Sequence, residues 1–271
     1  RTEDEYTMTL IGALPLLVKS DARSVANIGI GSGLTAEILL SHSAPREVHT
    51  IEIEPAMAMG AYAFYPRVDR LFKDRRAGVF FEDAKSYFAR HGRGYDVIVS
   101  EPSNPWVNGV AGLFTREFYR DTSRYLAPGG VFVQWLHFYE LNDRLLGSMF
   151  AAMDTAFSDY DVYQISAGDL AVVAVREGRV ALPGEMPAAE AGFLAELAKL
   201  GITRREHLLA RRVGSKRQLA PLLAQFGSPV NSDYYPYVQL EATRARFAQE
   251  GANAILGLAG DRAQIWQKFG V

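Results

Sequence analysis

Residues 95–114, YDVIVSEPSNPWVNGVAGLF, decide which fold the chain is expected to adopt. The apolar run 97–99 predicts a buried strand, and Glu101 follows it at the start of a proline-containing loop. A strand that ends in an acid and a turn places that acid at the carboxyl edge of an α/β sheet, where such sheets bind ligands. Asn104 follows in the same loop. The stretch therefore predicts an α/β fold with a site around Glu101.

Apolar strands and helical segments alternate on both sides of this stretch. Strands are predicted at 24–29, 47–53, 77–81, 95–100, 131–136, 160–165 and 170–176. Helices are predicted at 4–19, 34–40, from Pro55, at 84–90, 115–126 and 141–157. Strands separated by helices form right-handed βαβ units and a mostly parallel sheet. We therefore predict a doubly wound, mostly parallel, seven-stranded Rossmann-like sheet, with an antiparallel hairpin made by its last two strands.

The character of the sequence changes near Gly178. Pro183, Gly184 and Pro187 indicate a linker, and beyond it the pattern is that of short helices. These helices are predicted at 187–199, 203–211 and 214–225, followed by a helical tail. We therefore predict one domain over residues 1–178 and a helical C-terminal extension over 179–271.

The composition excludes several classes of protein. The 271 residues are 48% hydrophobic and carry a net charge of -2 without a basic stripe, which argues against a nucleic-acid partner. The absence of cysteine excludes disulfides, thiolate metal sites and cysteine nucleophiles. The histidines lack metal-ligand spacing, so no metal is predicted. The longest apolar run, 10–18, is too short to span a bilayer.

The first residue is Arg1 rather than methionine, which suggests that the chain is a piece of a longer protein. The expected location is the cytoplasm, either for the chain itself or for a cytoplasmic domain of a membrane-anchored parent.

A nucleoside signal lies between the first predicted strand and the following helix. The turn Gly29-Ile30-Gly31-Ser32-Gly33 lets a ligand approach the main chain closely. Glu52 ends the second strand, at the position of an acid that binds ribose hydroxyls. Asp83 follows the third strand, where it can accept a hydrogen bond from an adenine amino group. The turn lacks the last glycine of GxGxxG, which favours a mononucleoside such as S-adenosylmethionine over NAD.

Plainer roles for these acids stay open. Glu52 can be a solvated acid at a strand end, and Glu54 can be the ribose ligand instead. Asp83 can simply cap the helix that begins at Ala84.

The run from Val25 to Arg176 resembles the spermidine synthase family, the aminopropyltransferases on the class I methyltransferase fold. The phrases EPSNPW, GLFTREFY, LAPGGVFVQWL and NSDYYPYVQLEA are of the type found in a bacterial subgroup of spermidine synthase-like proteins. Members of that subgroup are often fused to membrane-spanning segments. The resemblance implies that the cofactor-binding residues are Gly29, Gly31, Ser32, Gly33, Glu52, Asp83, Ala84 and Glu101.

The resemblance also implies a transferase that moves an aminopropyl group from decarboxylated S-adenosylmethionine to a di- or polyamine. Glu101 and Asn104 stand at its catalytic positions, with Glu101 as base and amine anchor. The expected partners are a small-molecule amine, membrane segments outside this chain and a second copy in a homodimer. The expected substrate-binding residues are Glu5, Tyr6, Trp106, Gln134, Tyr139 and Asp233.

The chain departs from the family pattern in ways that keep other functions open. Ser32, Glu101 and Asn104 stand where the family carries aspartates, and the usual N-terminal β-domain is missing. Ser32 favours intact S-adenosylmethionine, which suits a methyl- or aminocarboxypropyl transferase. A non-catalytic domain that senses nucleosides or polyamines is a further alternative. Glu101 can also cap its loop or pair with an arginine, and Trp106 can belong to the core.

Overall fold

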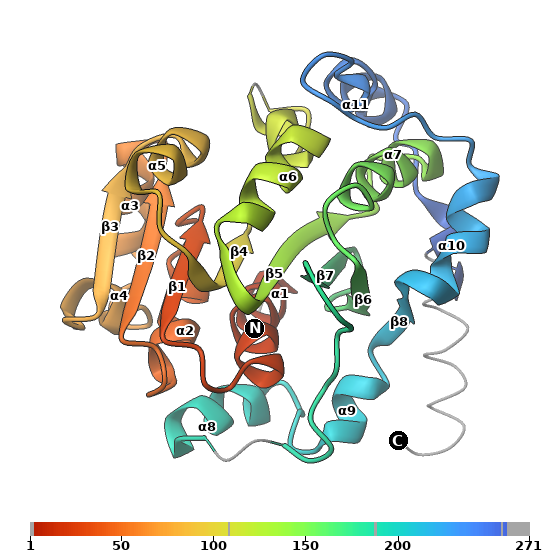
Figure 1. The fold of residues 1–271 in the computed structure, drawn as a ribbon. Coiled ribbons are helices and arrows are strands. Elements are labelled where there is room, and N and C mark those ends of the chain that lie inside the picture. The colour runs from red at the N-terminus through yellow and green to blue at the C-terminus, as the bar shows by residue number, and fades with distance from the viewer. Residues whose placement is uncertain (1–2, 108, 187–188, 256, 259–271) are drawn as a thin grey trace. The chain divides into compact units, whose positions relative to one another are not determined.

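A computed structural model of the chain describes residues 3–107, 109–186, 189–255 and 257–258 (Figure 1). The chain divides into two compact units, which are described in turn. The first comprises residues 1–101, 125–134 and 181–207, and the second comprises 102–124, 135–180 and 208–271. The predicted helices over 187–199 and at the C-terminal tail include 187–188 and 259–271, which lie outside the described residues.

Parallel strands form the centre of the first unit. They are β1 (Ser24–Ile28), β2 (Glu47–Glu52), β3 (Ala77–Phe81), β4 (Tyr95–Ser100) and most of β5 (Leu126–His137). β1 pairs with β2 and β4, β3 pairs with β2, and β5 pairs with β4, all in parallel. Val25, Val97 and Ile98 are fully buried, because parallel strands are covered on both faces. The apolar runs of the sequence are thus these central strands.

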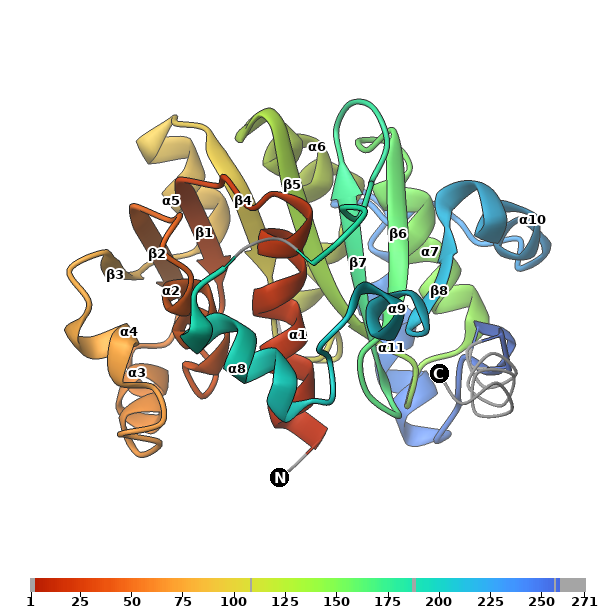
Figure 2. The same cartoon turned by 90° about the horizontal axis from the view of Figure 1, so that it is seen from below.

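Helices of the first unit connect several of these strands, and others precede or follow them in the chain. They are α1 (Glu3–Val18), α2 (Leu34–Ser41), α3 (Pro55–Tyr62), α4 (Asp69–Lys73), α5 (Ala84–His91), α8 (Ala191–Lys199) and the start of α9 (Arg205–Leu209). α1 packs against α2 and α8, and Figure 2 shows α8 beside α1. A Cβ at Gly12 of α1 would stand 2.9 Å from the carbonyl oxygen of Thr35 in α2, so glycine permits this close approach.

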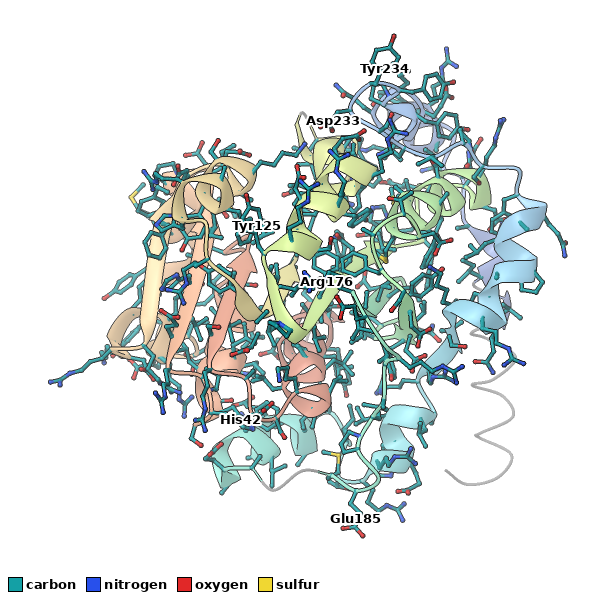
Figure 3. The ribbon with its side chains drawn as sticks, viewed as in Figure 1. His42, Tyr125, Arg176, Glu185, Asp233 and Tyr234 are labelled. Carbon is teal, nitrogen blue, oxygen red and sulfur yellow. The ribbon has the colours of Figure 1, made fainter. Side chains whose placement is uncertain are left out.

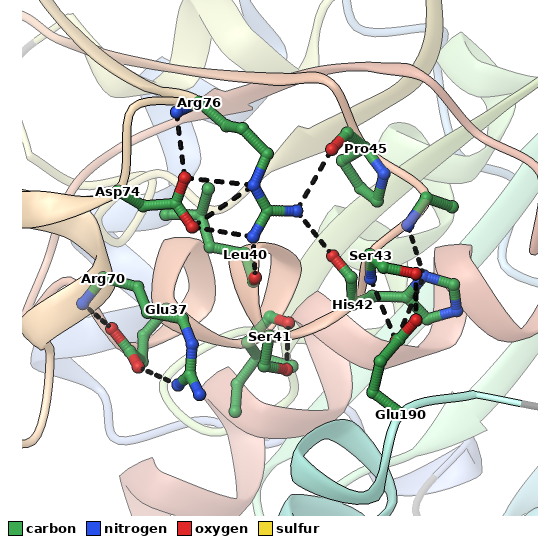
Figure 4. Close-up of polar contacts among 12 residues, drawn as sticks. Glu37, Leu40, Ser41, His42, Ser43, Pro45, Arg70, Asp74, Arg76 and Glu190 are labelled. Atoms are coloured by element: carbon green, nitrogen blue, oxygen red, sulfur yellow. Dashed lines mark hydrogen bonds and ion pairs between the residues drawn. The ribbon is translucent and has the colours of Figure 1, made fainter.

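The C-terminal end of α2 is held by Arg76, which lies just before β3 (Figure 4). The guanidinium pairs with Asp74 at 2.7 Å. It also donates hydrogen bonds to three backbone carbonyls, those of Leu40, His42 and Pro45. Glu190, the N-cap residue of α8, accepts a hydrogen bond from the backbone N–H of Ser43. The turn that follows α2 is therefore held by Arg76, and it also binds the N-terminus of α8 through Glu190.

The second unit combines antiparallel strands with helices. Its elements are η1 (Val110–Phe114), α6 (Arg116–Arg124), the end of β5, α7 (Asp143–Met153), β6 (Asp159–Gln164), β7 (Asp169–Val175), β8 (Arg212–Ser215), α10 (Lys216–Gln225) and α11 (Tyr237–Phe247). β6 pairs antiparallel with β7 and with β8. The Asn231 side chain donates to the carbonyl of Phe114 and accepts from the N–H of Val238, which fastens the loop before α11 to η1.

The expectation of seven strands is wrong, because the residues that the structure describes form a mixed sheet of eight strands. Its order is β3-β2-β1-β4-β5-β7-β6-β8. The additional strand, β8, lies where short helices were expected. Arg212 pairs with Asp161 of β6 at 2.7 Å, and Val213 is buried. Ser215 then caps α10 through reciprocal hydrogen bonds with Gln218, so the helix begins only after the strand.

Candidate functional site

The turn between β1 and α2 needs glycine at three positions. Gly29, Gly31 and Gly33 have φ angles of 93°, 48° and 85°, in the left-handed region. A Cβ at Gly29 would stand 2.4 Å from the carbonyl oxygen of Glu101. The glycine turn therefore lies directly against the backbone at the end of β4, and two predicted site segments meet.

Glu52 ends β2 with its carboxylate turned to the same glycine turn. Its Oε2 accepts a hydrogen bond from the backbone N–H of Ile30 at 3.0 Å. Its Oε1 accepts one from the N–H of Glu54 at 2.9 Å. Glu52 is only 8% exposed, whereas Glu54 is exposed and caps α3 through Ala56. A carboxylate has about four acceptor positions, so lone pairs remain for a pair of hydroxyl donors.

The Glu101 side chain is turned towards the start of α2. Its Oε2 lies 2.5 Å from Oγ1 of Thr35, the second residue of that helix. Glu101 itself is half-buried, and Thr35 is 2% exposed. The predicted base is thus held by a hydroxyl rather than by an arginine in this contact.

Ser32 is neutral, so it brings no charge to the glycine turn. Its hydroxyl lies 3.0 Å from the sulfur of Met8 on α1. Met8 therefore lies against the turn, a contact that no sequence pattern predicts.

Asp83 and Ala84 lie at the start of α5. Asp83 is exposed, and its Oδ1 accepts a hydrogen bond from the N–H of Ser86 at 2.9 Å, so it caps the helix. Ala84 is buried beside it. The cap uses one carboxylate oxygen, which leaves the adenine role of Asp83 as a prediction.

The remaining predicted residues of the first unit have different surroundings. Glu5 forms an ion pair with Arg67 at 3.6 Å, and Tyr6 beside it is half-buried. Gln134 is fully buried in β5 and donates to the carbonyl of Ser100 at 3.3 Å. Gln134 thus ties β5 to the last residue of β4, directly before Glu101.

In the second unit, Asn104 is oriented by His137. The ring Nδ1 of His137 lies 2.8 Å from the carbonyl oxygen of Tyr139, so Nδ1 carries the proton in that contact. The other ring nitrogen, Nε2, is then an acceptor, and it lies 3.4 Å from the amide Nδ2 of Asn104. This arrangement turns the amide oxygen of Asn104 away from His137.

Burial keeps His137 neutral, as this arrangement requires. Its pKa falls from 6.5 to about 4, because desolvation outweighs the opposing effects of the Tyr139 carbonyl and of Asp169. No sequence pattern connects His137 with Asn104. The two residues are 33 positions apart, so no local pattern could reveal their contact.

Aromatic rings surround His137. Tyr139 is 44% exposed and stacks on His137 with ring centroids 4.4 Å apart. Trp106 meets His137 edge-on at 5.0 Å. The guanidinium of Arg246, from α11, lies 5.1 Å from the centroid of the Trp106 ring and 3.7 Å from the Glu140 carboxylate. The Trp106 ring therefore faces a cation that the chain itself supplies.

Asp233 and Tyr234 lie on the loop that leads into α11 (Figure 3). Tyr234 is 94% exposed, and the backbone N–H of Asp233 donates to Glu117 of α6 at 2.8 Å. Asp233 is thus placed by α6 within its unit.

Among the residues that the structure describes, no group of three or more His, Asp or Glu side chains is arranged to hold a metal ion. None of the described helices is both long enough and apolar enough to cross a bilayer.

Comparison with known families identifies the relatives of this chain. A family model for the spermine/spermidine synthase domain matches residues 3–167. The polyamine aminopropyltransferase of Leptospira biflexa is 28% identical over 163 residues, which cover 59% of this chain and 57% of that protein. The chain thus spans little more than half the length of this relative.

Solved structures show the same fold. A spermidine synthase in complex with the transition-state analogue AdoDATO matches with a TM-score of 0.56, 18% identity and 72% of each chain covered. Human methyltransferase-like protein 13 in complex with SAH matches with a TM-score of 0.51 and 20% identity, covering 75% of this chain and 92% of that one.

Proposed function

The chain belongs to the spermine/spermidine synthase family, and from this membership we propose that it transfers the aminopropyl group of decarboxylated S-adenosylmethionine to a di- or polyamine. One observation carries the proposal. Glu52 bonds to the backbone of the glycine turn, and the backbone of Glu101 lies against that turn at Gly29. The proposed ribose ligand, Glu52, and the proposed base, Glu101, therefore both contact the glycine turn.

Glu52 would bind the two ribose hydroxyls through the lone pairs that its backbone donors leave available. The N–H groups of Ile30 and Glu54 orient the carboxylate before the ligand arrives. A preoriented acceptor reduces the entropy that binding must overcome. The sulfonium centre of the nucleoside would then lie beyond the ribose, towards Glu101.

The transfer step forms a C–N bond and breaks a C–S bond. The lone pair of the amine nitrogen attacks the methylene carbon next to sulfur, and the electrons of the C–S bond pass to sulfur. The products are methylthioadenosine and an amine lengthened by one aminopropyl group. Because the leaving group is already good, the protein mainly places and desolvates the amine.

Glu101 would attract the ammonium form of the acceptor and take its proton. An amine of pKa near 10 needs about 4 kcal/mol for deprotonation at pH 7. A carboxylate within hydrogen-bond reach can accept that proton as the new bond forms. Glu101 is half-buried and follows β4 at the carboxyl edge of the sheet, which suits this role.

Asn104 and Trp106 would bind the acceptor. With its amide nitrogen turned to His137, Asn104 can accept an amine N–H through Oδ1. A substrate ammonium at the face of Trp106 would take the place that the Arg246 guanidinium holds.

A second candidate function is methyl or aminocarboxypropyl transfer from intact S-adenosylmethionine. Ser32 favours it, because a neutral hydroxyl near Met8 does not repel the carboxylate that the intact cofactor carries. Fusion to membrane-spanning segments, a homodimer and a cytoplasmic location also stay predictions.

Product analysis tests the proposal. The purified chain is incubated with decarboxylated S-adenosylmethionine and putrescine, and in parallel with the intact cofactor. Methylthioadenosine and spermidine, lost in Glu101→Gln and kept in the surface variant Glu177→Gln, are the expected result. Adenosylhomocysteine from the intact cofactor would instead establish methyl transfer. Tight methylthioadenosine binding without turnover, unchanged in Glu101→Gln, would indicate a sensor.

A further inference from the structure

Thr35 has a hydroxyl group with two acceptor neighbours from different elements. Its Oγ1 lies 2.5 Å from Oε2 of Glu101 and 3.3 Å from the backbone carbonyl oxygen of Met8 on α1. Thr35 is 2% exposed, so its hydroxyl is shielded from bulk water. Thr35 lies in the first turn of α2, and this helix begins directly after the glycine turn. The helix therefore sets the position of the Thr35 side chain.

A hydroxyl has one proton to donate, and it can accept as well. When Glu101 is ionised, the Thr35 proton is donated to the carboxylate. When Glu101 is protonated, its own O–H donates to Thr35, and the Thr35 proton turns to the Met8 carbonyl. Each proton has an acceptor in both states, with no change in the positions of the heavy atoms.

We propose that Thr35 is a positioning residue for Glu101, holding this carboxylate in one place both before and after it takes the proton of the acceptor amine. The proposal rests on the proposed function for the identity of the proton donor. A proton moves from the amine nitrogen to Oε2 of Glu101, and rotation of the Thr35 O–H bond towards the Met8 carbonyl accommodates it. A base that is held in both states loses little alignment during the reaction.

The inference has a consequence for the pKa of Glu101. A hydrogen bond to an ionised acceptor is stronger than one between neutral groups. Removal of the Thr35 hydroxyl therefore weakens the ionised state more than the protonated one. We expect the pKa of Glu101 to rise by about one unit in Thr35→Val. Thr35→Ser restores the hydroxyl and should return the pKa close to that of the unchanged chain.

Thr50 provides a matched control in the same unit. It is a fully buried threonine on β2, and its Oγ1 has no hydrogen-bond partner within the described part of the chain. Thr50→Val removes the same hydroxyl group from the interior without touching Glu101. It should therefore leave the titration of Glu101 unchanged.

Two measurements on the whole chain test the proposal. The first follows the carboxyl carbon of Glu101 by NMR in glutamate-labelled protein without substrate, with Glu101→Gln to assign the signal. The second follows kcat/KM for aminopropyl transfer against pH, where Thr35→Val should move the acidic limb upwards by about one pH unit. Denaturant unfolding confirms that each variant is folded, and Thr35→Ala replaces Thr35→Val if the latter does not fold.

An identical Glu101 titration with and without the Thr35 hydroxyl would overturn the inference. If the unchanged chain shows no aminopropyl transfer while the Thr35 variants still shift the titration, the proposed function fails and the coupling between Thr35 and Glu101 stands. A shifted titration with an unshifted kinetic limb would mean that Glu101 is not the base, and the positioning role would be rejected.

Discussion

Ile30 and Glu52 are joined by a hydrogen bond of 3.0 Å from the backbone N–H of the first to the carboxylate of the second. One residue belongs to the glycine turn after β1 and the other ends β2. The bond orients a buried acid beside the turn, where a nucleoside ribose would need an acceptor. The neighbouring Glu54 has a different role, because its side chain caps α3.

Glu52→Gln should weaken the binding of methylthioadenosine by about 10- to 100-fold. Glutamine has one acceptor oxygen and no charge, so it cannot serve two backbone donors and a ribose diol together. Glu54→Gln is the matched control and should change affinity less than about threefold. Calorimetric titration measures both. The reverse ranking would make Glu54 the ribose ligand.

Gly29→Ala should lower the free energy of unfolding by more than about 3 kcal/mol. The new Cβ would meet the Glu101 carbonyl oxygen at 2.4 Å, and φ is 93°. Gly31→Ala has a left-handed φ but nothing within 4 Å of its Cβ, so it should cost only about 1 kcal/mol. Denaturant unfolding compares the two variants. Equal losses would show that the contact with Glu101 is not decisive.

Arg76→Lys should destabilise the chain by about 2–4 kcal/mol. A lysine ammonium cannot reproduce the planar contacts with Asp74 and with the carbonyls at the end of α2. Arg75→Lys, at an exposed neighbour, should stay within about 0.5 kcal/mol of the unchanged chain. The same unfolding measurement applies. A loss in Arg76→Lys no larger than in Arg75→Lys would refute the role given to Arg76.

Stability should fall as the pH decreases from 6.5 towards 4. Burial lowers the pKa of His137 from 6.5 to about 4, so the unfolded chain binds more protons in this interval. The contribution of His137 is present above pH 6.5, and about 3 kcal/mol of it is lost by pH 4. Burial also lowers the pKa values of His42 and His49, which adds a loss of the same sign.

The pH dependence is measured by denaturant unfolding at several pH values. His137→Asn should flatten the slope of the free energy of unfolding against pH between pH 7 and pH 4. This holds however much the substitution lowers the stability itself. His207→Asn, on α9, serves as the comparison. An unchanged slope in His137→Asn would show that His137 is not held neutral by burial.

Local patterns predicted the strands and the acids at their ends, because these features depend on neighbours in the sequence. The apolar run at β4 predicted a buried strand, and it is one. The glycine turn was expected to allow a close approach to the main chain, and its three glycines adopt positive φ angles. Glu52 and Glu101 were singled out because acids after parallel strands gather at one edge of a sheet.

Contacts between distant residues could not be predicted, because no local pattern encodes them. β8 is a strand only because β6 offers a partner and Asp161 offers a charge to Arg212. Thr35 looked like an ordinary residue of a helix, and only the folded chain brings it to Glu101.

The sequence by itself determined that strands and helices alternate and that acids stand at the end of β2 and after β3 and β4, since hydrophobic periodicity and chain order are enough for both. The tertiary structure alone decided which group each acid meets. Glu52 meets a backbone N–H, Asp83 caps a helix, and Glu101 meets a hydroxyl. The physical reason is that a hydrogen bond needs an approach within about 3 Å, and only packing of the whole unit sets such distances.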